Sequence, residues 1–282
     1  MRITGKSGAI YEVGKVVAAF KTYRLRLCQL SDGSGGDLLL QVATDVAHNA
    51  TLERSVYMLG RLAEEAERVE AEYAKVKKEA NHFLNYGLHF PEFMDTCVLD
   101  DQGGRRVNIL RLRGVEELAG VMSFSQLVKK DKRRVDLRTS VWIMRKLLKI
   151  LAFAHQIGVS IGDLSLQNIL IDREQHYVII FDWAKAQLLG DGMPRETIEA
   201  EVRAAAVSVI EVLNGTPEGG VPNFEKDERH KPYTDLLIEL ATEGRRDAFK
   251  AHSEFYKLVD GLWPRKYYPF THYPRQDRGE SE

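Results

Sequence analysis

Three polar residues in the middle of the chain have the types and spacing of a site for a metal-bound phosphate. Asp163 and Asn168 are five positions apart, and Asp182 follows Asp163 by nineteen. Carboxylate and amide oxygens are the ligands that Mg²⁺ prefers, and phosphoryl transfer also needs a group that orients the incoming hydroxyl. The alternative interpretation is a hairpin with solvated side chains, because Asp and Asn are common in turns.

The elements around these residues are predicted from hydrophobic periodicity. The apolar positions from Val141 to Ala152 follow a helical period that ends near His155. Residues 169–171 and 177–181 are typical of short strands, and residues 199–213 predict a buried helix that ends at Asn214-Gly215. We therefore expect Asp163 and Asn168 in a loop after a helix, and Asp182 directly after a strand.

The first part of the chain predicts a sheet with one helical segment. Strands are expected at residues 11–17, 22–30 and 38–43, and again at 93–99 and 106–112. The turn residues of 31–36 predict a hairpin, whereas residues 52–80 favour one long helix or two consecutive ones. Strands followed by helices indicate an α+β fold.

Composition limits the classes of partner. The 282 residues are 44% hydrophobic and 29% charged, which is typical of a globular protein with a sizeable core. Lys and Arg total 40 against 41 Asp and Glu, so net charge gives no reason to expect nucleic acid or an acidic membrane as a partner.

Cysteine usage and the amino terminus favour a cytoplasmic protein. Cys28 and Cys97 are the two cysteines, too few for a disulfide framework or a four-cysteine zinc site. The first residues carry no apolar run behind their positive charges, and no stretch approaches the ~18 apolar residues of a membrane span. We expect a reducing compartment and no membrane partner.

The stretch from His155 to Ala184 resembles the catalytic and metal-binding loops of protein kinases, whose pattern is H-R-D-L-x-x-x-N followed by D-F-G. The counterparts are Asp163-Leu164, Asn168 and Asp182-Trp183-Ala184. The resemblance implies one bilobal protein kinase-like domain, with a small β-rich lobe and a long helix in residues 1–112 and a larger, mainly helical lobe in residues 113–282.

The resemblance also implies a role for each residue and a set of ligands. Asp163 would be catalytic and accept the proton of the substrate, while Asn168 and Asp182 would hold magnesium. ATP would bind between the lobes, with Leu170, Gln41 and Lys21 among its contacts. The acceptor would be a hydroxyl of a protein or a small molecule, neither of which the sequence identifies.

Two further residues resemble structural parts of the kinase large lobe. Glu201 opens a helix similar to the central helix of that lobe, so it would anchor the backbone of the catalytic loop. The alternative for Glu201 is a first-turn carboxylate that the helix dipole favours. His155 occupies the place of a buried histidine ahead of the loop, and we interpret it as structural.

The sequence departs from protein kinases where they bind phosphate. The lysine of the kinase V-A-I-K strand is replaced by Gln41, and the position of its partner glutamate falls on Ser55, with Glu53 and Glu64 nearby. Both members of the usual ion pair are therefore expected to be missing.

Lys21 is a candidate replacement for that lysine. Val16, Ala18 and Lys21 occupy the positions where the glycine-rich loop would have glycines, but Ala19-Phe-Lys-Thr-Tyr23 resembles the loop of the With-No-Lysine kinases, which carry their phosphate-binding lysine there. The alternative is an exposed lysine on a hairpin, which is where lysines usually occur.

The substrate side departs as well. Ile161-Gly162 replaces His-Arg before Asp163, and Ser165 replaces the lysine two positions after it. Glu201 follows Asp182 by only 19 positions without an A-P-E signature, so docking of a peptide in the ordinary way is not expected. Residues 216–282 have no assigned chemistry, and their aromatic and proline residues favour packing against a lobe over docking of a partner.

Three functions remain in competition. An atypical kinase is favoured by Asp163, Asn168 and Asp182, whereas a pseudokinase that acts as an interaction module is favoured by Gln41, Ser55 and the altered loop. A metal-dependent hydrolase is the third alternative, and no histidine-rich cluster supports it.

Overall fold

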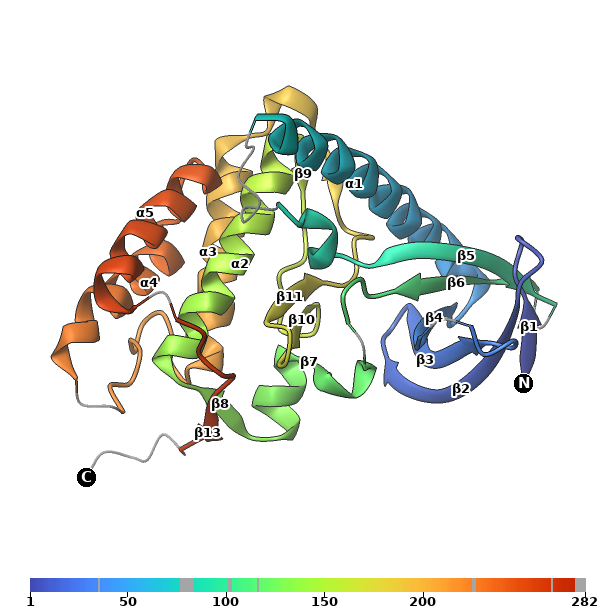
Figure 1. The fold of residues 1–282 in the computed structure, drawn as a ribbon, viewed down its shortest axis with the longest axis horizontal. Coiled ribbons are helices and arrows are strands. Elements are labelled where there is room, and N and C mark those ends of the chain that lie inside the picture. The colour runs from blue at the N-terminus through green and yellow to red at the C-terminus, as the bar shows by residue number, and fades with distance from the viewer. Residues whose placement is uncertain are drawn as a thin grey trace. The chain divides into compact units, whose positions relative to one another are not determined.

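The computed structural model describes residues 1–34, 36–76, 84–100, 103–115, 117–224, 227–264 and 266–276. The chain divides into two compact units (Figure 1). The amino-terminal unit holds residues 1–119 together with residues 181–186, and the carboxy-terminal unit holds residues 120–180 and the chain from residue 187 onward.

The amino-terminal unit is built on an antiparallel sheet with the strand order β1-β2-β3-β4-β6-β5. Its strands are β1 (Arg2–Thr4), β2 (Ile10–Ala19), β3 (Tyr23–Leu30), β4 (Leu38–Ala43), β5 (Glu92–Leu99) and β6 (Arg105–Arg111). The predicted strands are confirmed, but β1 was missed because three residues show no period. It pairs with β2 through Ile3 opposite Tyr11.

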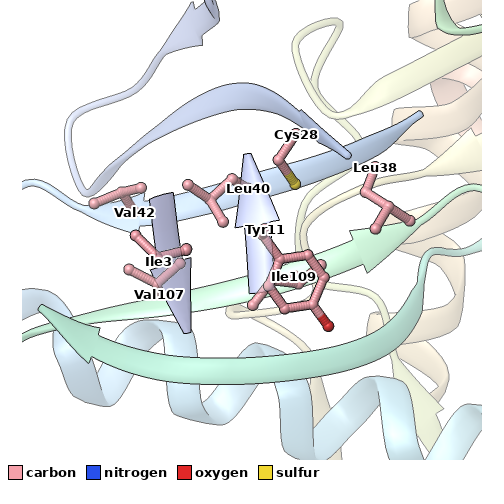
Figure 2. Close-up of a cluster of buried hydrophobic side chains, with 8 residues drawn as sticks. All are labelled: Ile3, Tyr11, Cys28, Leu38, Leu40, Val42, Val107 and Ile109. Carbon is pink, nitrogen blue, oxygen red and sulfur yellow. The ribbon is translucent and has the colours of Figure 1, made fainter. Parts of the chain in front are cut away.

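One face of this sheet carries a cluster of buried apolar side chains (Figure 2). The members come from every strand except β5: Ile3, Tyr11, Cys28, Leu38, Leu40, Val42, Val107 and Ile109. Burial, with a smaller contribution from the Asp37 charge, raises the pKa of the Cys28 thiol to about 12, so this cysteine is a neutral apolar side chain.

Helix α1 (Asn49–Val76) packs against β4, β5 and β6. Its buried residues recur every three or four positions, as expected for an amphipathic helix: Leu52, Ser55, Met58, Leu59, Leu62 and Ala66. The helix begins three residues before the predicted start because Asp45 accepts a hydrogen bond from the backbone of Ala47 and caps a 3₁₀ turn at Val46–His48. Residues 77–80 of the prediction lie outside the described residues.

The carboxy-terminal unit is mainly helical, and its described residues also form one three-stranded sheet and two strand pairs. Its helices are α2 (Leu137–Gln156), α3 (Arg195–Val212), α4 (Lys231–Glu243) and α5 (Ala248–Leu262). Its strands are β7 (Val121–Ser123), β8 (Arg133–Val135), β9 (Val159–Ser160), β10 (Ile169–Asp172), β11 (Tyr177–Ile180), β12 (Gln187–Leu188) and β13 (His272–Pro274).

Two helices in this unit end close to where the sequence predicts, but α3 begins at Arg195, four residues before the predicted start at residue 199, and no start was predicted for α2. Asp136 accepts a 2.8 Å hydrogen bond from the backbone of Thr139 and caps α2, whose apolar positions are buried up to Ala154. Helix α3 ends in a turn at Asn214, where φ is 71°, and Gly215 closes the turn with a 2.9 Å bond to the carbonyl of Ile210.

The segment after α5 packs onto the same unit, which confirms packing for these residues. Strand β13 pairs with β8, so the last described part of the chain lies beside the entry to α2 (Figure 1). Tyr268 donates a hydrogen bond to Asp136, and the backbone of Thr271 donates to Thr139 at 3.0 Å. This segment is therefore held to the unit by Tyr268 and Thr271, while its proline residues stay exposed.

The fold class predicted from the sequence is confirmed: a curled antiparallel sheet with a long helix comes first, and a mainly helical unit follows. Within the described ranges, the structure has no helix with the length and apolar character needed to cross a membrane.

Candidate functional site

The residues singled out in the sequence fall into two groups. Asp163, Asn168 and Leu170 belong to the carboxy-terminal unit, while Lys21, Gln41 and Asp182 belong to the amino-terminal unit. We describe each group within its own unit.

The loop between β9 and β10 holds Asp163 and Asn168 together. The Nδ2 group of Asn168 donates a 2.8 Å hydrogen bond to the carbonyl of Asp163. The Oδ1 atom of Asp163 accepts a 3.0 Å bond from the backbone of Ser165, which forms a tight turn. Asn168 is buried and Asp163 half-buried. The spacing of five residues thus closes a compact loop with a carboxylate and an amide at its two ends.

Glu201 anchors this loop from helix α3. Its Oε1 accepts a 2.7 Å bond from the backbone of Gly162, and its Oε2 lies 2.7 Å from Nε2 of His155. Gly162 has φ of 75°, which favours glycine directly before Asp163. Glu201 is only 7% exposed. The predicted anchoring role is therefore confirmed, and His155 is a structural partner of the anchor.

Two further bonds hold the loop backbone after Asp163. Ser208 lies two turns after Glu201 in α3. Its hydroxyl donates a 2.8 Å hydrogen bond to the carbonyl of Leu164. The backbone of Ser125 donates to the carbonyl of Leu166 at 2.9 Å. Neighbouring elements thus hold the backbone of the loop on both sides of Ser165, which preorganises the side chain of Asp163.

An open cavity of about 480 Å³ lies beside Asp163. It is walled by the Asp163 loop, by the segment that includes β12, and by the first turns of α3. Its charged lining residues are Asp163, Glu196 and Glu201, and no Lys or Arg lines it among the described residues. The cavity therefore favours a neutral or cationic guest over an anionic one.

Leu170 lies two residues after Asn168, in the middle of β10. It pairs with Ile179 of β11 on one side and with Ser123 of β7 on the other. Its side chain is half-buried, whereas its neighbours Ile169 and Ile171 are fully buried.

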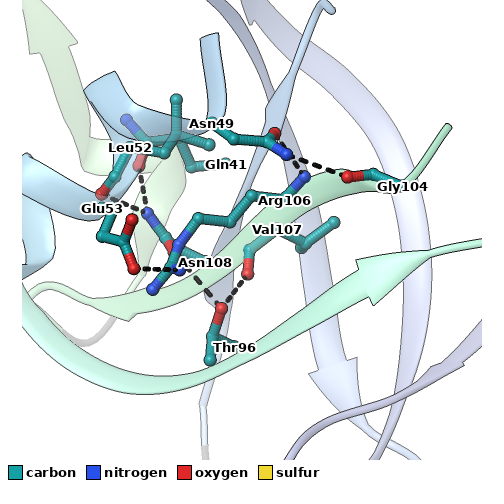
Figure 3. Close-up of polar contacts among 9 residues, drawn as sticks. All are labelled: Gln41, Asn49, Leu52, Glu53, Thr96, Gly104, Arg106, Val107 and Asn108. Carbon is teal, nitrogen blue, oxygen red and sulfur yellow. Dashed lines mark hydrogen bonds and ion pairs between the residues drawn. The ribbon is translucent and has the colours of Figure 1, made fainter. Parts of the chain in front are cut away.

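Gln41 belongs to a buried network of neutral groups (Figure 3). It is 1% exposed and lies opposite Asn108 in the register of β4 and β6. Nδ2 of Asn108 lies 3.1 Å from Oε1 of Gln41 and also 3.1 Å from the carbonyl of Leu52 in α1. The amides of Gln41 and Asn108 therefore help hold α1 to the sheet.

Charged groups lie at the edge of this network. Arg106 donates to Oδ1 of Asn108 at 3.1 Å and pairs with Glu53 of α1 at 3.3 Å, as Figure 3 shows. Ser55, at the position of the usual partner glutamate, is buried. The link between α1 and the sheet thus uses amides inside and one ion pair outside.

Lys21 lies at the tip of the β2–β3 hairpin and is exposed. The tip is tight: the backbone of Phe20 donates to the carbonyl of Tyr23 at 2.8 Å, and their rings are 4.6 Å apart. The hydroxyl of Thr44 donates to the carbonyl of Lys21 at 2.9 Å. These contacts fix the backbone at Lys21 and leave its ammonium group in solvent.

The segment of residues 181–186 packs with the amino-terminal unit. Trp183 is fully buried, with its ring edge-on to Phe90 at 6.3 Å. Oδ1 of Asp182 accepts a 2.9 Å bond from the backbone of Ala184. Arg54 of α1 donates to the carbonyl of Ala186 at 2.9 and 3.3 Å. Helix α1 therefore holds the end of the segment that carries Asp182.

Arg54 and Asn108 were missed in the sequence. Neither belongs to a motif, and the partners are far apart in the chain: 132 residues separate Arg54 from Ala186, and 67 separate Asn108 from Gln41. For Arg54 the sequence offers one signal, which is that it directly precedes Ser55, a position already singled out on the same helix.

The two predicted metal ligands, Asn168 and Asp182, lie in different units, and each carries an oxygen of the kind that Mg²⁺ binds. Nδ2 of Asn168 donates to the carbonyl of Asp163, and Oδ1 of Asp182 accepts from the backbone of Ala184. No group of three or more His, Cys, Asp or Glu side chains suited to a metal is found in the described part of the chain. Mg²⁺ is usually bound by one or two carboxylates with water and substrate phosphates, so the chemistry of these two side chains fits it.

No family model matches the sequence, and no curated protein matches it. Solved structures match it widely, in 1848 chains, so the fold is a common one. One of these is a structure of vaccinia related kinase 3, which aligns with 93% of this chain and 90% of its own at a TM-score of 0.62 and 15% identity. The fold is therefore the bilobal protein kinase-like fold, and at this identity the likeness shows the fold alone.

Proposed function

We propose that this chain is a kinase-like phosphotransferase that binds ATP with magnesium and transfers the γ-phosphoryl group to a hydroxyl. The observation that carries the proposal is the anchored loop, in which Glu201, Ser208 and Asn168 fix the backbone around Asp163. An interaction module without chemistry has no need to hold a half-buried carboxylate so firmly.

In this proposal Asp163 orients the acceptor hydroxyl and takes its proton as the oxygen attacks the γ-phosphorus. Asn168 and Asp182 hold magnesium, which offsets the negative charge of the phosphates when it is bound. Leu170 contributes an apolar contact to the nucleotide. Phosphoryl transfer depends mainly on positioning and electrostatics, so the fixed backbone around Asp163 is suited to it.

Positive charge for the phosphates comes from Lys21 in this proposal. Gln41 is neutral and buried in the amide network, so it contributes at most a hydrogen bond to the nucleotide. Lys21 has an exposed side chain on a fixed backbone, which suits a cation that meets phosphate from the hairpin tip.

The acceptor enters the cavity beside Asp163. A volume of about 480 Å³ is in the range of small-molecule sites, and its acidic lining favours a neutral or cationic hydroxyl compound over a phosphorylated one. We therefore favour a small molecule over a protein as the acceptor.

The proposal is tested by thermal unfolding with ATP, with Mg²⁺, and with both. We expect a rise in Tm that needs both ligands, because binding to the folded state alone stabilises it by about 2.7 kcal/mol at a hundredfold excess over Kd. Asp182→Asn should abolish the rise, and release of ADP should fall about 10²–10⁴-fold in Asp163→Asn.

The two variants control for each other. Asp163→Asn should keep the ligand-dependent rise in Tm that Asp182→Asn loses, and each should match the Tm of the parent protein without ligand. A rise that survives in Asp182→Asn would contradict the metal assignment. Unchanged ADP release in both Asp163→Asn and Lys21→Ala would contradict phosphoryl transfer.

A pseudokinase is the second candidate, and the neutral network of Gln41 and Asn108 favours it. Such a protein would present the kinase-like fold to a partner without turnover. The absence of any rise in Tm with ATP and Mg²⁺ in the parent protein would support it.

A further inference from the structure

A second cavity, of about 350 Å³, lies in the carboxy-terminal unit and shares no lining residue with the cavity beside Asp163. Its walls are α2, the end of α5, the segment that follows α5, and the turn between β10 and β11. Because every lining residue belongs to one unit, its shape depends on that unit alone.

One wall of this cavity is a stack of three rings. His176 lies between Trp142, at 4.7 Å and 9°, and Tyr267, at 4.9 Å and 2°. Tyr267 is 76% exposed, so the outer ring of the stack faces solvent. Burial, and after it the Lys146 charge, lower the pKa of His176 against the opposing effect of Asp172, which keeps the imidazole neutral at pH 7.

Two nitrogen atoms in this stack lack hydrogen-bond partners in the described part of the chain. They are Nε1 of Trp142, whose side chain is 7% exposed, and Nε2 of His176. Buried donors and acceptors are usually paired, because leaving one unpaired costs free energy. Both nitrogen atoms are themselves buried, so the stack presents its ring faces and edges, rather than these atoms, to the cavity.

The other walls carry an excess of positive charge. Among the described lining residues, Arg138, Arg145 and Lys266 are opposed by Asp260, which gives a net charge of +2. The guanidinium of Arg138 lies over the ring of Tyr268 at 4.4 Å and donates to the carbonyl of Pro264 at 3.4 Å, so it is held in place. The guanidinium of Arg145 lies over the ring of Tyr256 at 6.0 Å.

The like charges behind this wall are mutually unfavourable. Lys146 is half-buried next to Arg145, and its ammonium group forms no ion pair with a described residue. Burial and the Lys149 and Arg145 charges lower the pKa of Lys146 to about 8. The ammonium group of Lys146 is therefore destabilised by its burial and by repulsion from Lys149 and Arg145. An anion bound nearby would reduce this repulsion.

We propose that this cavity binds a phosphate monoester, with its phosphate on Arg145, Arg138 and Lys266 and its organic part against the ring stack. A phosphate monoester carries about −1.5 to −2 charges at pH 7, which matches the net charge of the lining. One guanidinium group can donate two parallel hydrogen bonds to two oxygens of a phosphate, and the faces of aromatic rings pack against apolar groups. The cavity volume suits a small head group.

The same chemistry has two sources: a free phosphorylated small molecule, or a phosphorylated side chain of a peptide. Phenyl phosphate and a phosphoserine peptide are therefore titrated separately by calorimetry, with phenol and the unphosphorylated peptide as matched probes. We expect one phosphorylated probe to bind at least tenfold more tightly than its control. The tighter of the two phosphorylated probes identifies the source.

Arg145→Ala should weaken binding of that probe at least tenfold, whereas Lys257→Ala, an exposed lysine of α5 outside the cavity, should leave it unchanged. Arg145→Lys keeps the positive charge but loses the two parallel N–H donors of the guanidinium group. Its affinity for the probe should lie between that of Arg145→Ala and that of the parent protein. Equal Tm values for the parent protein and each variant without ligand would verify that the variants fold. Equal binding by Arg145→Ala and the parent protein, or binding of neither phosphorylated probe at millimolar concentration, would overturn the proposal.

Discussion

The loop around Asp163 and the network around Gln41 belong to different units of the chain, and they differ in which polar groups they keep of the protein kinase pattern that the sequence resembles. The loop keeps a carboxylate, an amide and a glutamate anchor in direct hydrogen-bond contact. The network consists of two amides and the carbonyl of Leu52, where the sequence resemblance would expect a lysine–glutamate ion pair.

The network shows that a helix can be held to a sheet by neutral amides, without a buried ion pair. The network still ties α1 to the sheet, because Asn108 donates to both β4 and α1. A buried pair of neutral amides avoids the large desolvation cost of a buried ion pair. What the exchange removes is a positive charge for phosphate, so that charge must come from elsewhere if phosphate is bound.

Gln41→Lys should have the largest effect on stability, because it places an ammonium group where the wild-type side chain is 1% exposed and its partner is an amide. We expect a loss of about 4 kcal/mol in the free energy of unfolding. Urea denaturation measures it. Gln41→Lys combined with Ser55→Glu should recover part of the loss if the ion pair can be rebuilt.

If Gln41→Lys alone lowered the free energy of unfolding by less than 1 kcal/mol, a lysine would be tolerated at this position. The contrast between a charged loop and a neutral network would then not hold. Gln41→Met, which is close to lysine in length and carries no charge, is the matched control for volume.

Glu201→Ala should cost about 3 kcal/mol, because it leaves the buried Nε2 of His155 and the backbone N–H of Gly162 without their partner. Denaturation with urea gives the value. Glu196→Ala, an exposed residue of the same helix, should change stability by less than about 0.5 kcal/mol. Equal losses in the two variants would show that the loop does not depend on its anchor.

Lys146→Met extends the comparison to a half-buried charge without an ion-pair partner among the described residues. Because the folded pKa of Lys146, about 8, lies below the unfolded value of 10.5, the unfolded state binds more protons between these values. The charge therefore destabilises the protein fully below pH 8, and the penalty fades as pH rises toward 10.5. We expect Lys146→Met to add about 2 kcal/mol at pH 7.

The pH dependence separates this effect from packing. The gain in Lys146→Met should shrink between pH 8 and pH 9.5, measured by urea denaturation at each pH, whereas Lys257→Met should show no such trend. A gain that is constant across this range would indicate a change in packing rather than in charge.

The sequence could predict the loop but not the network, for a physical reason. Asp163, Asn168 and Glu201 have short-range spacing that chemistry dictates, so the anchor of the loop was predictable. Gln41 and Asn108 meet through the register of β4 and β6, which no local pattern reveals. The boundary of α1 was shifted because Asp45 caps a 3₁₀ turn ahead of the helix, and β1 depends wholly on its pairing with β2.

The bond between Arg54 and Ala186 has a consequence for synthesis on the ribosome. The amino-terminal unit includes residues 181–186, so its packing is incomplete until the chain has been made that far. Arg54 must wait for a partner 132 residues later, which takes roughly 7 to 26 s at common translation rates. During that interval Phe90 lacks Trp183, and a chaperone that binds nascent apolar surfaces would find this unit exposed there.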